Sequence, residues 1–358
     1  MSLNQFPILW LDALKFKMRY LITGHTGFKG AWLAAMLKAQ GHDVVGISLP
    51  PESNSLYKEA RISDFFSSEH FLDIRDRAEF SKAIRISDFD IAFHFAAQPL
   101  VRVSYASPIE TYETNVIGTL NFLESIKEKE IQSVVVITTD KVYKNKNLLR
   151  GYSEADELGG HDPYSSSKAA ADIATQSWVA SYECKNISIA RAGNVIGGGD
   201  TAKDRLIPDL INAFAQGNPA IIRYPNSIRP WQHVADCLSG YLALSDAMIT
   251  SGFTGEWNFG PPIDLDTPVS KVADLSAKVW GNGATWELAT DPQLHESGYL
   301  LLDSSKARKT LQWGDKLDFE KSIEWTIDFY KRVTQGEDPR KMLEDQVTRY
   351  LNLKATIN

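Results

Sequence analysis

Short apolar runs rich in β-branched residues alternate with helical spacing through the first half of the chain. These runs predict buried strands at residues 20–23, 43–49, 88–96, 133–138 and 187–191, with helices after Gly30, over 108–129 and from Tyr164 onward. Strands that are apolar on both faces belong to parallel sheets, whose right-handed crossovers are usually helical. The alternation therefore predicts an α/β fold with a doubly wound parallel sheet.

The pattern loosens beyond about residue 195. Helices are expected at 205–216, 233–250, 268–280 and 319–333, and short strands at 221–224 and 256–259. We interpret residues 18–195 as a cofactor-binding domain that carries the catalytic residues. Residues 196–358 are expected to form mainly a smaller mixed α/β substrate-binding region.

Residues 1–17 form a short apolar segment ahead of Met18, which directly precedes the first strand. The segment has no basic leader and no small-residue cleavage site. We interpret it as an N-terminal extension or expression artefact packed loosely on the body, with a functional arm as the alternative.

The turn between the first strand and the first helix carries glycines at Gly24, Gly27 and Gly30. At this spacing the first glycine lets the chain reverse, the second lets a pyrophosphate approach the backbone, and the third lets helix pack on strand. The helix N-terminus then offers free N–H groups to phosphate. A turn that binds nothing is the alternative. The cofactor-binding candidates here are Gly24, Thr26, Gly27, Phe28, Lys29 and Gly30.

The end of the second strand, residues 47–50, carries neither an acid nor an arginine. An acid there would hold the ribose hydroxyls of NAD, and an arginine would favour the extra phosphate of NADP. Ser48 remains as a weak ribose ligand, and the absence of a basic residue favours NAD over NADP.

Tyr164 and Lys168 stand four residues apart, so they share one face of the predicted helix. The lysine is expected to lower the phenol's pKa and to bind the nicotinamide ribose, which would make Tyr164 a base for an alcohol proton. A surface pair is the alternative.

With these motifs and the run His94-Phe-Ala-Ala-Gln98, residues 18–335 resemble the extended short-chain dehydrogenase/reductase family, whose sheet is of the Rossmann type. The resemblance implies that the segment holding Ala96 and Gln98 runs under the cofactor and that Asp73 holds the adenine amino group. It also implies that Asn115 supports the active site. We interpret His94 itself as a core residue with satisfied hydrogen bonds.

After the strand at 133–138 come Thr139, Asp140 and Lys141. An acid and a base beside the tyrosine indicate proton transfers beyond alcohol oxidation, whereas a simple helix cap is the alternative. By resemblance, this triplet looks like that of the nucleotide-sugar 4,6-dehydratases, and lysine in the third position is similar to the CDP-glucose 4,6-dehydratases. Catalytic roles are therefore assigned to Thr139, Asp140, Lys141, Tyr164 and Lys168.

Other segments extend this resemblance to the substrate site. The Phe-Lys pair of the glycine turn, residues 191–200 with 204–209, and residues 228–234 look like that group's cofactor turn and nucleotide-sugar loops. Thr201 departs from the group, which usually carries tryptophan there. The implied substrate-binding residues are Gln98, Asn194, Arg205, Leu206, Arg229 and His233.

The implied reaction is internal hydride transfer through tightly held NAD. Tyr164 would take the O4 proton of a hexose while Thr139 holds O4. Asp140 and Lys141 would remove the proton from C5 and protonate the leaving O6 hydroxyl, and which residue does which is left open. The alternatives are an inverting dehydratase of UDP-N-acetylhexosamines or another nucleotide hexose, a 4-epimerase, and an NAD-sensing regulator without turnover.

Composition limits the partners. The net charge of -7 argues against nucleic acid and anionic membranes, and no apolar run approaches the roughly 20 residues of a membrane span. Only two cysteines are present, which favours a reducing, cytoplasmic compartment. No metal site is predicted. The family resemblance implies a homodimer or homotetramer paired through helices near 108–129 and 164–183, and a place in bacterial surface dideoxyhexose synthesis.

Overall fold

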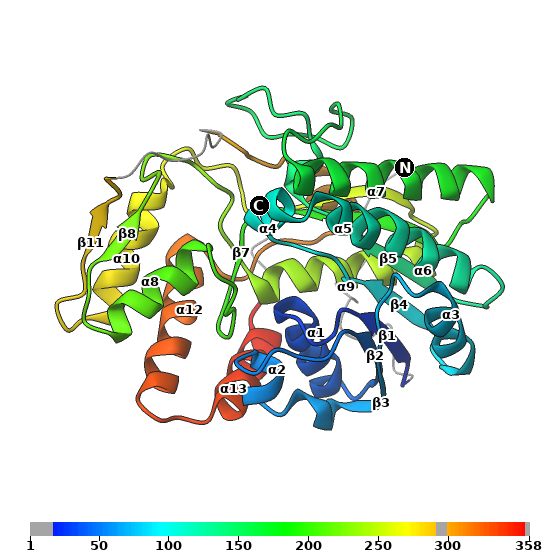
Figure 1. Cartoon of the computed structure of the whole chain (residues 1–358), viewed down its shortest axis with the longest axis horizontal. Coiled ribbons are helices and arrows are strands. Elements are labelled where there is room, and N and C mark those ends of the chain that lie inside the picture. The colour runs from blue at the N-terminus through cyan, green and yellow to red at the C-terminus, as the bar shows by residue number, and fades with distance from the viewer. Residues whose placement is uncertain (1–16, 291–298, 355–358) are drawn as a thin grey trace, which may run out of the picture.

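The computed structural model describes residues 17–290 and 299–354. Its centre is a seven-stranded sheet in the order β10-β6-β5-β4-β1-β2-β3, with every neighbouring pair parallel (Figure 1). The strands are β1 (Arg19–Thr23), β2 (Asp43–Ser48), β3 (Phe66–Phe71), β4 (Ile91–His94), β5 (Ser133–Ile137), β6 (Ile187–Ala192) and β10 (Gly255–Phe259). The strand order reverses at β1, which confirms the predicted doubly wound sheet.

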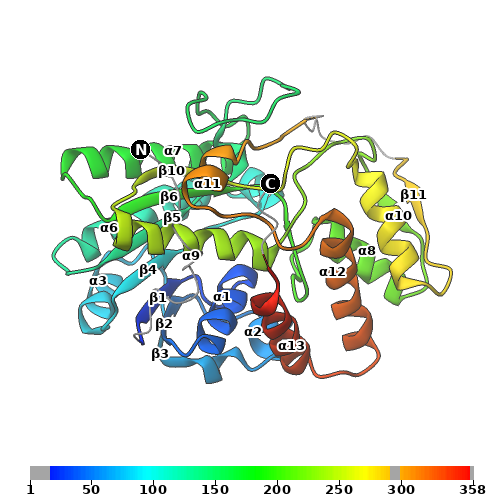
Figure 2. The same ribbon diagram turned by 180° about the vertical axis from the view of Figure 1, so that it is seen from behind.

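Helices cover both faces of this sheet because its strands are apolar on both sides. The helical segments of the first half are α1 (Phe28–Ala39), α2 (Leu56–Glu59), η1 (Ile62–Phe65), α3 (Arg77–Ile86), α4 (Val101–Ala106), α5 (Pro108–Tyr112), η2 (Glu113–Ile117), α6 (Gly118–Ile126), η3 (Asp140–Val142) and α7 (Pro163–Ser181). Those of the second half are α8 (Leu206–Ala215), α9 (Val234–Ser251), α10 (Val269–Trp280), α11 (Ser305–Thr310), α12 (Phe319–Thr334) and α13 (Pro339–Asn352). One core joins α1, α9 and α13 to the sheet, and another joins α3, α6 and α7 to its other face (Figure 2).

A smaller region lies beside the sheet, built from α8, α10, α12 and the paired strands β8 (Ala220–Ile222) and β11 (Trp286–Leu288) (Figure 1). It has its own apolar cluster, in which Ile323 and Ile327 of α12 are fully buried. The short pair β7 (Val195–Ile196) and β9 (Gln232–His233) also lies in this half of the chain. The mixed α/β region expected after the cofactor-binding part is therefore present.

One strand assignment was wrong. Residues 256–259 were expected in the smaller region, but β10 pairs with β6 as the last strand of the main sheet. Helix α9 likewise packs against the main sheet rather than in the smaller region. The two parts therefore interleave along the chain beyond residue 195. The segment 1–17 falls, apart from residue 17, outside the described residues.

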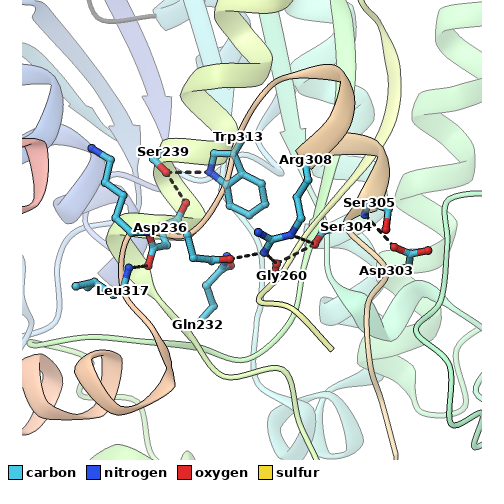
Figure 3. Close-up of polar contacts among 12 residues, drawn as sticks. Gln232, Asp236, Ser239, Gly260, Asp303, Ser304, Ser305, Arg308, Trp313 and Leu317 are labelled. Atoms are coloured by element: carbon cyan, nitrogen blue, oxygen red, sulfur yellow. Dashed lines mark hydrogen bonds and ion pairs between the residues drawn. The ribbon is translucent and has the colours of Figure 1, made fainter. Parts of the chain in front are cut away.

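A buried polar cluster fastens the C-terminal segment to α9 and β10, as Figure 3 shows. Asp236 accepts hydrogen bonds from the backbone N–H groups of residues 316 and 317, at 2.7 and 3.2 Å. Arg308 pairs with Asp315 and donates to the carbonyl of Gly260. Trp313 donates to Ser239 at 3.0 Å. These bonds bring the C-terminal segment, which is distant in sequence, onto the main body.

Candidate active site

A cavity of about 2300 Å³ opens at the carboxyl ends of the strands, between the sheet and the smaller region. Its wall includes the turn after β1, the ends of β2 and β4, the segment after β5, the start of α7 and the loops that precede α8 and β9. A pocket for one small ligand is usually about 300–1,000 Å³. The larger volume here suits a dinucleotide and a second nucleotide-sized ligand together.

The glycine turn forms the floor of one end of the cavity. Gly24 has a positive φ of 74°, and a Cβ there would lie 2.8 Å from the backbone nitrogen of Ala96. A Cβ on Gly30 would lie 2.6 Å from the Gly24 oxygen, so helix and turn are in close contact as predicted. Gly27 is less crowded, with one backbone atom at 3.3 Å. No side chain caps the first turn of α1, which leaves its N–H groups for an anion.

The adenosine end of the predicted cofactor site contains Ser48 and Asp73. The Thr26 hydroxyl lies 2.8 Å from that of Ser48, which ties the glycine turn to the end of β2. Asp73 is held by the guanidinium of Arg75, with Nε–Oδ2 at 2.9 Å and Nη2–Oδ2 at 2.6 Å. These bonds lower the pKa of Asp73. Both Asp73 and Arg75 line the cavity, and Arg75 was not anticipated.

Phe28 and Lys29 line the cavity from the first turn of α1. The Lys29 ammonium points to α9, where it lies 3.4 Å from the Tyr241 hydroxyl and 3.8 Å from the Cys237 sulfur. The lysine therefore connects the cofactor turn to the helix beneath it.

Gln98 lines the cavity, but its side chain bonds to its own loop and to α5. Its Nε2 donates to the Leu100 carbonyl and to Thr111, and its Oε1 accepts from the Leu100 N–H at 2.6 Å. Asn115 holds the same loop by accepting from the Gln98 N–H at 2.8 Å and donates to Ser167 of α7 at 2.8 Å. Asn115 thus connects the loop to the tyrosine helix, and Gln98 shapes the loop.

His94 is buried, with its ring nitrogens 2.8 Å from the Thr23 hydroxyl and 3.2 Å from that of Thr119. Burial, with help from the Lys168 charge, lowers the pKa of His94 to about 3. The interpretation of His94 as a satisfied core residue agrees with this geometry.

Three predicted catalytic groups form one chain of contacts. The Tyr164 hydroxyl is hydrogen-bonded to Thr139, and the Thr139 hydroxyl donates to Asp140 Oδ1 at 2.9 Å. Asp140 is only 1% exposed, and its Oδ2 has no hydrogen-bond partner among the described residues. Burial raises the pKa of Asp140 against the opposing charges of Lys141 and Arg229. This direction of the pKa shift is the one that an acid requires.

Lys141 is half-buried and lines the same cavity. It follows Asp140 in the single turn η3, which the Thr139 side chain caps by accepting from the Lys141 N–H. Asp140, Lys141 and Tyr164 thus line the same cavity.

The pKa of Tyr164 runs against the sequence prediction. Burial raises it to about 12, opposed by the Thr139 hydrogen bond and the Arg205 charge. Lys168 donates instead to the Ile137 carbonyl at 2.9 Å, and burial lowers the pKa of Lys168 to about 8. The protein alone therefore does not depress the phenol, because desolvation outweighs the nearby positive charge.

Arg205 and Arg229 both line the cavity, together with Asn194 and Leu206. Arg205 pairs with Asp200 at 2.8 Å, and its charge acts on Tyr164. Arg229 is 5% exposed and acts on Asp140. The Arg205 side chain, which is 36% exposed, belongs to the cavity wall.

His233 is the predicted substrate residue that the structure moves elsewhere. It is fully buried, and its Nδ1 accepts from the Ala235 N–H at 3.2 Å as the cap of α9. Its ring contacts the edges of Trp32 and Trp325, and it does not line the cavity. The substrate-binding assignment of His233 was wrong, because the side chain is needed to begin the helix that follows.

Two further arginines were missed. Arg102 of α4 and Arg223 after β8 both reach Asp204, at 2.9 and 3.6 Å, and all three line the cavity. They lie far apart in sequence and belong to no motif. Only the packing of the smaller region against the sheet brings them together.

Known proteins resemble this chain over most of its length. Residues 20–259 match the model of the NAD-dependent epimerase/dehydratase family. The CDP-glucose 4,6-dehydratase of Salmonella typhimurium is 42% identical over 346 residues, which cover 93% of this chain and 96% of that protein.

Solved structures share the fold. The dTDP-glucose 4,6-dehydratase of Bacillus anthracis, solved in complex with NAD, superposes with a TM-score of 0.75 at 24% identity, covering 91% of this chain and 99% of that one. The UDP-glucose 4-epimerase of Thermotoga maritima superposes with a TM-score of 0.78 at 19% identity, covering 88% and 99%.

Proposed function

The chain belongs to the NAD-dependent epimerase/dehydratase family, and from this we propose that it dehydrates CDP-D-glucose to CDP-4-dehydro-6-deoxy-D-glucose. The observation that carries the proposal is the contact chain from Tyr164 through Thr139 to a buried Asp140 whose pKa is raised, with Lys141 beside it. An epimerase has no use for this acid and base. The relative with 42% identity is itself a CDP-glucose 4,6-dehydratase.

The residues of the glycine turn fit the dinucleotide. Gly24 and Gly30 occupy positions that a Cβ would fill, and the first turn of α1 presents uncapped N–H groups. Ser48 and Asp73 would hold the adenosine end, and Lys168 the nicotinamide ribose. Bound there, NAD would supply the acceptor for the C4 hydride and its return to C6, so that the net reaction is loss of water.

The first proton transfer is assigned to Tyr164. We assign it the removal of the O4 proton, with Thr139 holding O4 in place. The phenol's raised pKa requires that its anion be stabilised during the reaction. The Arg205 charge acts in that direction.

The loss of water is assigned to Asp140 and Lys141. Once C4 is a ketone, the C5 hydrogen is acidic, and we assign Lys141 to remove it. Asp140 protonates the departing C6 hydroxyl, so water is released, and Lys141 returns the proton to C5 when hydride returns to C6. Burial raises the pKa of Asp140, which favours Asp140 as the acid in this division of roles.

The substrate's diphosphate is assigned to the arginines of the cavity. Arg205 and Arg229 line its wall with Asn194 and Leu206, and guanidinium groups match phosphate oxygens. Arg102 and Arg223 add positive charge near Asp204. The preference for cytosine rests on the relative rather than on a residue of this chain.

A substrate screen tests the proposal. Purified enzyme is mixed with CDP-, dTDP-, GDP- or UDP-hexoses and catalytic NAD, and products are identified by mass and by the absorbance of the keto sugar in alkali. CDP-glucose should give a 4-keto-6-deoxy sugar without accumulation of reduced cofactor. A product from UDP-N-acetylhexosamine alone, a C4 epimer, stoichiometric reduced cofactor, or binding without turnover would each overturn the proposal.

We also propose a cytoplasmic homodimer that serves surface dideoxyhexose synthesis. No helix within residues 17–290 and 299–354 is long and apolar enough to cross a membrane. Exposed isoleucines lie along neighbouring helical segments, with Ile109 on α5, Ile117 on η2 and Ile173 on α7, at 71%, 49% and 52% exposure. A second copy of this face would cover them.

A further inference from the structure

The segment from Thr138 to Tyr143, which carries the acid–base candidates Asp140 and Lys141, is called the acid–base turn. Beneath it lies a fully buried ion pair between Asp172 of α7 and Arg191 of β6, which are 0% and 1% exposed. Two parallel bonds join them, Nε to Oδ2 at 2.8 Å and Nη2 to Oδ1 at 2.7 Å. The sequence assigned no role to either residue.

The ion pair holds the acid–base turn at both ends. At its start, the Thr138 hydroxyl donates to Asp172 Oδ2 at 3.0 Å. At its end, Arg191 Nη1 donates to the Tyr143 hydroxyl at 2.9 Å. That hydroxyl in turn donates to Asn258 of β10 at 2.7 Å. The turn therefore spans two fixed points set by one pair of charges.

The same pair fixes the tyrosine helix. Asp172 lies four residues after Lys168 and eight after Tyr164, so all three share one side of α7. The Asp172 carboxylate on α7 binds β6 through Arg191 and the acid–base turn through Thr138. These bonds set the distance between α7 and the acid–base turn. The Asp172 carboxylate also accepts a hydrogen bond from the Gln176 side chain of the same helix.

We propose that Asp172, Arg191 and Tyr143 are positioning residues of the dehydration, which hold Asp140 and Lys141 in register with Tyr164 and Lys168. This inference rests on the proposed function. A buried ion pair is a poor source of stability, because desolvation of the charges offsets their attraction. Here its directional bonds reach both catalytic elements, which gives the pair a purpose that an apolar replacement would lack.

The carboxylate also acts on Lys168 through its charge. Asp172 raises the pKa of that lysine, whereas burial and the Lys29 charge from α1 lower it. His94 of β4 faces the lysine in neutral form. Because the lysine works as a cation, activity should fall as pH rises past about 8, the pKa of Lys168. Loss of the Asp172 charge should move this decline to lower pH.

Tyr143→Phe is the decisive variant, because it removes one hydroxyl and leaves the ion pair intact. Asp172→Asn leaves a buried guanidinium unpaired and costs stability. We expect Tyr143→Phe to lower kcat by roughly tenfold to a hundredfold, since small misplacements of reacting groups have effects of that size. KM for CDP-glucose should stay within about twofold, and amide hydrogen exchange in the acid–base turn should accelerate.

Tyr350→Phe is the matched control. The Tyr350 hydroxyl also donates to a buried group, Asp236 Oδ1 at 2.7 Å, in the cluster that fastens the C-terminal segment. Its loss should reduce the melting temperature without changing kcat beyond about twofold. Equal kcat in wild type and Tyr143→Phe, or equal losses in Tyr143→Phe and Tyr350→Phe, would overturn the positioning role.

Asp172→Asn adds the pH readout, measured on whatever fraction of the variant is folded by circular dichroism. The alkaline decline of kcat should shift downward in this variant and stay in place in Tyr143→Phe. If the alkaline decline of kcat in Asp172→Asn stays where it is in wild type, the Asp172 charge does not raise the pKa of Lys168 as proposed. The proposed function is judged separately, by whether wild type turns over CDP-glucose at all.

Discussion

Asp140 shows how one carboxyl is prepared for acid chemistry by its surroundings. Its side chain is 1% exposed, and desolvation favours the neutral form more strongly than Lys141, Thr139 and Arg229 favour the charged one. Its free Oδ2 lies against Gly193, where a Cβ would come within 3.0 Å. The lack of a side chain at Gly193 thus lets its backbone pack closely against the acid.

The division of roles between Asp140 and Lys141 can be tested by Lys141→Ala. We expect kcat to fall by about a hundredfold or more, because a positioned base contributes roughly 10²–10⁴. Affinity for CDP-glucose, measured by calorimetry, should remain near that of wild type. Exchange of the C5 hydrogen with deuterated solvent should also stop.

The control is Lys146→Ala, which removes an exposed lysine paired with Glu157 at 3.0 Å. It should retain wild-type turnover. If C5 exchange persists in Lys141→Ala and disappears in Asp140→Asn, the base is Asp140 and the two roles are reversed.

At the scale of elements, the glycine turn depends on backbone contacts that cannot adjust. A Cβ at Gly30 would meet the Gly24 oxygen at 2.6 Å and the His25 Cα at 2.7 Å. Overpacking of this kind costs about 1–3 kcal/mol. We therefore expect Gly30→Ala to weaken NAD binding by about tenfold or more, measured by calorimetry.

Gly260→Ala is the corresponding control, because a Cβ there would meet only Leu302, at 3.5 Å or more. It should bind NAD like wild type. Unchanged affinity in a folded Gly30→Ala protein would show that α1 can shift without disturbing the phosphate-binding turn.

Hydrophobic runs predicted the elements that are buried on both faces. β1, β5 and β6 are buried along almost their whole length, and each was placed within a residue or two. β3 was missed because its residues are mostly polar and lie at the sheet edge. α13 was missed because its helix is largely charged, with a narrow buried side formed by Met342, Leu343, Val347 and Tyr350.

The site was predictable where chemistry is local in sequence. Thr139, Asp140 and Lys141 are consecutive, and Tyr164 and Lys168 share one helix turn, so their patterns were visible. His233 was misassigned because a helix cap and a ligand look alike in a motif. The pKa of Tyr164 could not be foreseen, since burial depends on the whole fold.

At the scale of the whole molecule, buried neutral histidines link stability to pH. Burial lowers the pKa of both His94 and His233 to about 3. The unfolded chain binds these protons below about pH 6.5, so stability falls as pH drops from there toward 3. Burial and the charge of Asp315 raise the pKa of Asp236 to about 7. The folded protein therefore binds this proton more tightly than the unfolded chain does, so the contribution of Asp236 to stability rises as pH falls.

His233→Asn isolates one histidine, because asparagine can still cap α9. One fewer proton should flatten the pH dependence of the unfolding free energy by about 1.4 kcal/mol per pH unit. Urea unfolding at several pH values below neutrality measures the slope. Parallel slopes for variant and wild type would show that His233 is not neutral in the fold.

The proposed dimer contact can be tested at the exposed isoleucines of α5, η2 and α7. Ile109 and Ile117 stand eight residues apart, on one side of the α5–η2 segment, and Ile173 lies exposed on the adjacent α7. Carboxylates buried at such a contact would face their own symmetry mates, and their desolvation is costly. Ile109→Asp with Ile173→Asp should therefore convert the assembly to monomers in sedimentation velocity experiments. Ile86→Asp, at a residue 69% exposed on α3, should leave the mass unchanged. A wild type that sediments as a monomer, or a double variant that stays dimeric, would place the subunit contact elsewhere.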